Sequence, residues 1–114
     1  MLIFKILTAG QWSALNIDGS TAGAPVDLAD GFIHFSTAGQ LAATAAKHFA
    51  WQGDLVLAAV DPARFGDALK WEPARGGELF PHLYATLGLD DISWARPLPV
   101  GPDGVHSIPP EVSA

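Results

Sequence analysis

The chain has 114 residues, a common size for one domain, and 49% of them are hydrophobic, enough to build one core. Its formal net charge is −6, with only six Lys and Arg residues, which argues against nucleic acid as a partner because such binders cluster their basic residues. The chain has no cysteine, which excludes disulfides and thiol nucleophiles and is compatible with a reducing compartment.

The sequence favours a cytoplasmic protein with one folded domain. Residues 1–4 lack the basic start of a secretory leader, and no apolar run approaches the roughly 18 residues that a membrane-spanning helix requires. We expect the domain to cover residues 1–98. Residues 99–114 contain four of the nine prolines and predict an extended tail that either lies over the domain or frays.

The first third of the chain predicts two strands and a short helix. The bounded apolar run at residues 2–7 is typical of a strand, and Thr8 is a suitable cap for a helix that runs to Leu15. Residues 16–29 contain several Asp, Gly and Ser residues and a proline, so an irregular loop is expected. A second strand is predicted at residues 32–35.

The main helix is expected directly after this second strand. Thr37 and Gln40 have the spacing of a capping box, which predicts a helix that begins there and runs to about Ala50. The apolar residues Leu41, Ala45 and Phe49 have helical spacing and define the buried stripe of this helix. Thr44 and His48 lie beside the stripe.

The second half of the chain predicts strands at residues 54–60, 68–71 and 92–97. The glycine pair in residues 75–78 predicts a turn, and Pro81 divides the apolar residues 79–84, so this segment is expected to be a loop that leads into a strand or short turn. Strands with few helices, placed early in the chain, indicate an α+β fold with a largely antiparallel or mixed sheet.

His34 and Ser36 are the first candidates for a functional site. They stand two residues apart on a predicted strand, so their side chains share one face, near the start of the main helix. An imidazole and a hydroxyl near a helix N-terminus suit a phosphate or carboxylate ligand. The alternative is structural: His34 satisfies a buried carbonyl, and Ser36 only begins the helix.

His82 and Glu72 are the second pair of candidates. His82 lies between large apolar residues after a rigid proline, which orients its ring, although this context slightly favours the structural alternative of a half-buried histidine packed against Tyr84. Glu72 could orient a histidine, bind a ribose hydroxyl or act as a general base, and Trp71 could form a pocket wall; surface pairing and packing are their structural alternatives. His48 is expected to flank the helix and His106 to be solvated. Asp30 and Glu78 border turns, where acidic residues are common.

Several established motifs are missing. The sequence contains no Walker-type glycine loop, no Gly-x-Gly-x-x-Gly and no His-Glu-x-x-His, which disfavours phosphate loops and zincins. A metal site made by His34, His82 and either Glu72 or Glu78 would require three distant segments to converge, so no metal is expected.

The chain resembles an uncharacterised bacterial family known as domain of unknown function 952. The resemblance extends from about residue 3 to residue 96, and its specificity comes from the order in which these motifs occur: Asp30-Gly31-Phe32-Ile33-His34-Phe35-Ser36, then Gln40, then Leu69-Lys70-Trp71-Glu72, then Phe80-Pro81-His82-Leu83-Tyr84.

That family in turn resembles the ADP-ribosyltransferase fold, and in particular the RNA 2′-phosphotransferases. Ile33-His34-Phe35-Ser36 looks like the strand that lies beside their NAD-binding cleft. The resemblance implies a compact α+β fold with a split pair of small sheets, one main helix after the second strand, and a cleft for NAD or an ADP-ribose-like molecule. It implies catalytic roles for His34, His82 and Glu72, and ligand-binding roles for the following residues: Lys5, Ser36, Trp71 and Tyr84.

Three functions follow as hypotheses. The first is an ADP-ribosyltransferase-like enzyme, or a degenerate one, that acts on a nucleotide-type ligand. The second is a module that binds such a ligand without turning it over. The third is a structural partner protein whose histidines only pack. The sequence leaves the oligomeric state open.

Overall fold

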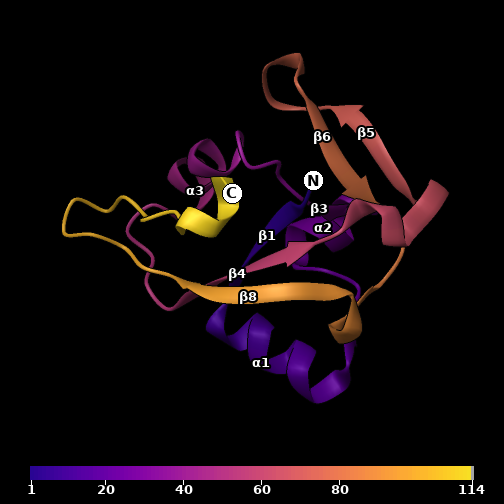
Figure 1. Ribbon diagram of the computed structural model, residues 1–114, viewed down its shortest axis with the longest axis horizontal. Helices are drawn as coiled ribbons and strands as arrows, with labels where there is room; N and C mark the ends of the chain where they lie inside the picture. Colours follow the sequence, from indigo (N-terminus) through magenta and orange to yellow (C-terminus); the bar gives the residue numbers. More distant parts are fainter. Residues whose placement is uncertain (114) are drawn as a thin grey trace.

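The chain forms an α+β fold with small antiparallel sheets, shown as a ribbon in Figure 1. The computed structural model describes residues 1–113. One sheet has the order β1-β4-β8 and a second the order β3-β6-β5, while β2 and β7 form a third. The strands are β1 (Ile3–Thr8), β2 (Ser20–Thr21), β3 (Ile33–His34), β4 (Leu55–Val60), β5 (Leu69–Pro73), β6 (Leu79–Leu83), β7 (Leu87–Gly88) and β8 (Ile92–Leu98). The helices are α1 (Ala9–Asp18), α2 (Pro25–Asp30) and α3 (Leu41–Phe49), and short 3-10 turns cover Pro62–Ala68, Arg75–Gly77, Leu89–Asp91 and Pro110–Ser113.

Strand β4 lies at the centre of the first sheet and is apolar on both faces. Its side chains alternate between two clusters, so Leu57 packs in the core near α3 while Val60 packs in the core near β3 and β6. Strand β1 alternates in the same way, with Phe4 in the first cluster and Ile3 in the second. The sheet therefore separates two hydrophobic cores.

The edge of β1 connects the first sheet to the segment after β3. Phe4 N donates to Ser36 O at 2.8 Å, and Ser36 N donates to Phe4 O at 2.9 Å. Beside it, Phe35 N donates to Pro81 O at 3.0 Å. Pro81 has no N–H to return to Phe35 O, so the β3–β6 ladder ends at this pair. The two sheets thus meet around Ser36.

Most of the predicted elements are confirmed. The strands β1, β4, β5 and β8 and the turn at residues 75–78 occur where they were expected. Thr8 is the N-cap of helix α1 and forms a complete capping box: Thr8 Oγ1 accepts from Gln11 N, and Gln11 Oε1 accepts from Thr8 N. Helix α3 buries its predicted stripe, with Leu41 and Ala45 inside and Phe49 packed against the core.

The predicted loop at residues 16–29 is wrong. Helix α1 continues to Asp18, β2 follows, and α2 begins at Pro25. Pro25 suits the first position of a helix, and Asp27 accepts a hydrogen bond from Ala24 N at 2.8 Å. Pro25 and Asp27 thus belong to the first turn of helix α2, which is too short to show a periodic pattern.

Two predictions in the middle of the chain also need correction. The capping box at Thr37 is only half formed: Gln40 Oε1 accepts from Thr37 N at 3.0 Å, but α3 begins at Leu41. Residues 79–83 form strand β6, not a loop, and this strand is central in its sheet. Pro81 is tolerated because its nitrogen faces the place where β3 ends.

The described part of the tail packs on the domain. Val112 is buried in the core cluster near α3. His106 is only 7% exposed, and its Nε2 donates to Gln52 O at 2.7 Å, so the prediction that His106 is solvated is wrong. The tail lies against the segment after α3 at this point, since Trp51 N also donates to Gly104 O.

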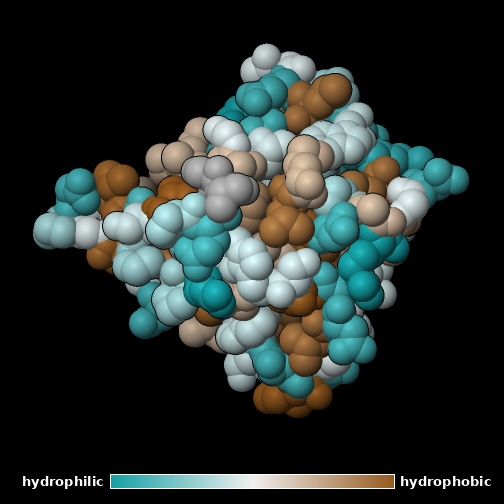
Figure 2. Space-filling model, in the orientation of Figure 1, coloured by the Kyte–Doolittle hydropathy of each residue, from teal (hydrophilic) through white to brown (hydrophobic). Residues whose placement is uncertain are grey.

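No helix within residues 1–113 has the length and apolarity needed to cross a membrane. On the face of the molecule in Figure 2, hydrophobic residues are scattered among hydrophilic ones. Exposed apolar side chains do occur singly, such as Ile17 at the end of α1.

The central position of β4 predicts a large stability effect. Leu57 has no exposed surface, so Leu57→Ala should lower the free energy of unfolding by about 2–5 kcal/mol through lost burial and a cavity. Ile17→Ala, at an 80% exposed position, is the control and should change stability by about 0.5 kcal/mol or less. Urea denaturation measures both; equal effects would contradict the assignment of β4 to the core.

Candidate functional site

Asp27 on α2 is a buried carboxylate that holds three parts of the chain together. Its Oδ2 lies 3.0 Å from Lys5 Nζ and accepts from Ala24 N at 2.8 Å. Its Oδ1 lies 2.6 Å from His34 Nδ1 and accepts from His34 N at 3.1 Å. With four donors and almost no exposed surface, Asp27 fixes β1, α2 and β3 relative to one another.

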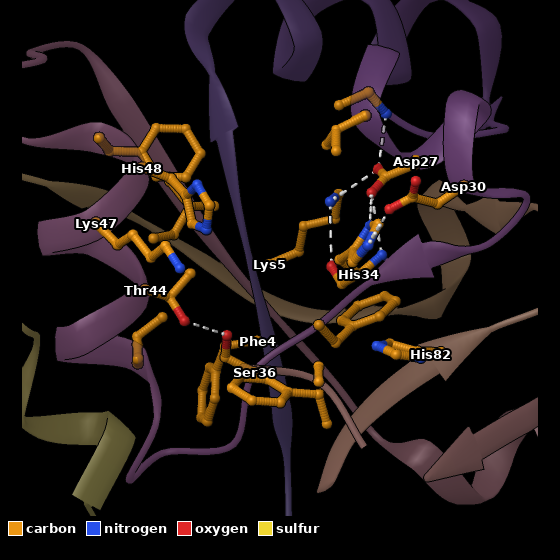
Figure 3. Close-up of a pocket in the computed structure, with 18 of the residues that line it drawn as sticks. Phe4, Lys5, Asp27, Asp30, His34, Ser36, Thr44, Lys47, His48 and His82 are labelled. Carbon is orange, nitrogen blue, oxygen red and sulfur yellow. Dashed lines mark hydrogen bonds and ion pairs between the residues drawn. The ribbon is translucent and has the colours of Figure 1, made fainter. Parts of the chain in front are cut away.

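His34 lies between two carboxylates. Besides its contact with Asp27, its Nε2 lies 2.9 Å from Asp30 Oδ2. Carboxylates only accept hydrogen bonds, so the doubly protonated ring is the form that donates to both. Lys5 Nζ also donates to His34 O at 3.1 Å, which fixes the backbone under the ring. Figure 3 shows this group on one side of β1.

The network lowers the pKa of Asp27. Burial alone raises this pKa, but the hydrogen bond from His34 and the positive charge of Lys5 outweigh that effect and lower it from 3.8 to about 2. Asp27 is therefore ionised across the physiological pH range and balances the charge of buried Lys5.

His82 on β6 has a separate anchor. Its Nδ1 lies 2.9 Å from Glu72 Oε1, and the same oxygen accepts from Tyr84 OH at 2.7 Å. These two hydrogen bonds, first that from Tyr84 and then that from His82, lower the pKa of Glu72, and the bond to Glu72 raises the pKa of Tyr84 above 10.0. The ring of Phe32 stacks on His82 with centroids 4.0 Å apart. His82 is thereby fixed in orientation, with Nε2 as its remaining polar atom.

Ser36 belongs to a third set of contacts, on the α3 side of the site. Thr44 Oγ1 donates to Gln40 O at 3.1 Å and has no second proton. It must therefore accept from Ser36 Oγ at 2.9 Å and from Arg75 Nη2 at 3.1 Å. Ser36 consequently presents an acceptor oxygen, since its own proton is used.

A pocket of about 540 Å³ connects these groups along the edge of β1. This volume lies within the roughly 300–1,000 Å³ typical of small-molecule sites. Its walls carry three of the six Lys and Arg residues and three of the four histidines of the chain. These are Lys5, Lys47, Arg75, His34, His48 and His82; the apolar part of the wall includes Phe4, Ile6, Phe35, Phe49 and Phe80.

The positive charges on the α3 side lie close enough to affect one another. Partial burial, followed by the charges of Lys47 and Arg75, lowers the pKa of His48 below its usual 6.5. Two acidic residues, Asp27 and Asp30, also line the pocket, and both contact His34. The α3 wall is therefore electropositive within a chain of net charge −6.

The structure brings most of the predicted site residues together. The pocket is lined by Lys5, His34, Ser36 and His82. Glu72 does not line it but contacts His82, and Tyr84 donates to Glu72. Trp71 does not join them, because neighbouring side chains on β5 point to opposite faces and Glu72 faces His82. His48 also lines the pocket, in addition to flanking the helix as predicted.

Sequence reasoning missed Asp27, Thr44, Lys47 and Arg75 as site residues. Asp27 was hidden in a segment interpreted as a loop, and Arg75 stands on a turn far along the chain from α3. One signal was present: Thr44 and His48 are one helical turn apart, on the same side of α3, with Lys47 between them.

In the part of the chain that the structure describes, no group of three His, Asp or Glu side chains converges as a metal site would require. His34 and His82 each have a carboxylate at Nδ1, and those carboxylates belong to different residues.

Fold and pocket together define an α+β protein with small antiparallel sheets and a cation-lined pocket at the edge of β1. The profile of the family described as "Protein of unknown function (DUF952)" matches residues 6–95, so the chain belongs to that family.

Solved structures of one bacterial protein are similar to this chain over its full length. The crystal structure of protein CC0527 from Caulobacter crescentus is 43% identical, covers 100% of both chains and has a TM-score of 0.95. A crystal structure of its double mutant is 42% identical, with the same coverage and TM-score. The solution NMR structure of CC0527 is 47% identical over 91% of this chain and 90% of that one, with a TM-score of 0.83. Among curated proteins, no sequence matches the chain.

The Asp27 network predicts a specific acid sensitivity. A lowered pKa means that ionised Asp27 stabilises the fold fully above about pH 4, and this stabilisation, about 2 kcal/mol at 1.36 kcal/mol per pH unit, is lost as the pH falls from 3.8 to about 2. Asp27→Asn should cost about 3–5 kcal/mol near neutral pH, because Lys5 loses its buried counter-charge, and should flatten this acid transition.

Urea denaturation between about pH 2 and 6 measures this effect. Asp18→Asn, at an exposed position of α1, is the matched control and should keep the wild-type pH dependence. An unchanged acid transition in Asp27→Asn would show that another group causes it.

The contact between Tyr84 and Glu72 predicts a measurable titration. Tyr84 is the only tyrosine in the chain, so ultraviolet absorbance of the phenolate reports this residue alone. The wild-type midpoint should lie above 10.0, and Glu72→Gln should lower it because the charged acceptor is removed. Glu111→Gln, on the tail, should leave it unchanged; equal midpoints in wild type and Glu72→Gln would rule out the contact.

Proposed function

We propose that the chain binds a small nucleotide-type anion in this pocket, with NAD or ADP-ribose as the ligands to try first. The observation that carries the proposal is the collection of half of the Lys and Arg side chains of an acidic protein around one pocket. Positive charge in a concave site attracts anions, and the apolar side chains beside it suit a base or a nicotinamide ring.

The resemblance to the ADP-ribosyltransferase fold supports the same ligand class. The motif Ile33-His34-Phe35-Ser36 lies where two small sheets meet, with the pocket beside it. In this proposal a ligand hydroxyl takes the place of Asp30 at His34 Nε2, and His34 orients or protonates the ligand through that atom. Ser36 accepts a hydrogen bond from a ligand hydroxyl, because its proton is already donated to Thr44.

A transferase activity is the second candidate, and His82 favours it. Glu72 orients the ring through Nδ1, and a histidine held in this way can accept a proton at Nε2 from a hydroxyl or water. The alternative is a module that binds the ligand without turnover. Release of free nicotinamide from NAD, measured by chromatography, would identify the enzyme; saturable binding with no product would identify the module.

The proposal predicts stabilisation by ligand. NAD or ADP-ribose at 100 times its dissociation constant should stabilise the protein by about 2.7 kcal/mol in thermal denaturation. His34→Asn, which keeps a donor for Asp27 but removes Nε2, should abolish most of this shift, whereas His106→Gln, at a histidine outside the pocket, should retain it. The absence of any shift with either ligand in the wild type would reject the proposed function.

A further inference from the structure

Arg75 differs from the other two arginines of the chain. Arg64 pairs with Asp91 at 2.9 Å, and Arg96 pairs with Glu111 at 3.0 Å. Within residues 1–113, no carboxylate forms an ion pair with Arg75, although its side chain is partly buried in the pocket wall. Its positive charge is therefore uncompensated, which is costly for a structural arginine and useful for one that binds an anion.

The guanidinium of Arg75 is nevertheless held in place. It lies 4.9 Å above the ring of Phe80, and Nη2 donates to Thr44 Oγ1 at 3.1 Å. These contacts use one face of the guanidinium plane and one of its five N–H groups. The remaining N–H groups keep a fixed fork geometry, which matches two oxygens of a phosphate.

The turn between β5 and β6 supports this placement. Gly76 and Gly77 have φ values of +70° and +78°, which side chains rarely adopt, and Gly77 N donates to Ala74 O at 2.8 Å. This tight turn places Arg75 opposite α3, where Thr44 lies.

Lys47 on α3 adds a second uncompensated charge. It lines the same pocket, and no ion pair involves it within the described residues. Figure 3 shows Lys47 with Thr44 and His48 on the α3 side of β1, across from Asp27 and His34. The pocket thus has a positive end at α3, and at α2 an end whose charges are already paired.

We propose that Arg75 and Lys47 form a subsite for the diphosphate group of the ligand, with its nucleoside directed toward His34 and His82. This inference rests on the proposed nucleotide-type ligand and assigns its orientation. Each phosphoryl group of a diphosphate diester carries one negative charge, so the two uncompensated cations match its charge. The Asp30 end, in contrast, would repel a phosphate and accept ribose hydroxyls.

Titration calorimetry with ADP-ribose tests the subsite. Arg75→Gln should weaken binding by about 10- to 100-fold, the range expected when hydrogen bonds to a charged group are lost. Lys47→Gln should weaken it less, because a lysine contributes a point charge without the fork. Arg96→Gln removes the same formal charge from an exposed ion pair outside the pocket, and it should change binding by about twofold or less.

Inorganic pyrophosphate is the second probe, and it separates the subsite from the proposed function. Binding of both probes that depends on Arg75 supports both. Pyrophosphate binding that depends on Arg75, without binding of ADP-ribose, supports the subsite and rejects the nucleotide ligand. ADP-ribose binding that is lost in His34→Asn but unchanged in Arg75→Gln overturns the subsite alone, and no binding of either probe to the wild type overturns both.

Discussion

The rest of the site depends on the hydrogen bonds and the ion pair that the buried carboxylate of Asp27 forms. An ionised group with almost no exposed surface is stable only where donors replace the water it has lost, and Asp27 receives donors from Lys5, His34 and Ala24. Because these donors come from β1, β3 and the segment before α2, one carboxylate positions all three. His34 can be held rigidly beside an open pocket because its Nδ1 is fixed in this way.

The two ends of the pocket differ in electrostatic character because a carboxylate neutralises the cation at one end only. At α2, the charge of Lys5 is neutralised by Asp27, so that end is polar without being strongly cationic. At α3, Arg75 bonds to a hydroxyl and an aromatic ring instead of a carboxylate, and its charge persists. A chain with twice as many acidic as basic residues thus keeps a local positive field in its pocket.

The sequence predicted the parts of the fold that periodicity or chemistry marks locally. The apolar run of β4 and the Thr8 cap of α1 lie where their patterns indicate. It did not predict α2, whose six residues are too few for a periodic pattern, or β6, where a proline in a central strand is acceptable only because β3 ends beside it.

Some residues of the candidate site could likewise be predicted from local patterns, and others could not. Alternation along a strand placed His34 and Ser36 on one face, and Glu72 does lie beside His82. Asp27 and Arg75 could not be identified. The contact of Asp27 with Lys5 and that of Arg75 with Thr44 each join residues more than 20 positions apart and depend on how the sheets meet.

A crystal structure of the protein with ADP-ribose tests the central claim most directly. We expect the diphosphate beside Arg75 and Lys47, the ribose facing His34, and the contacts among Asp27, Lys5 and His34 unchanged. A ligand bound outside the pocket, or one whose binding separates His34 from Asp27, would contradict it.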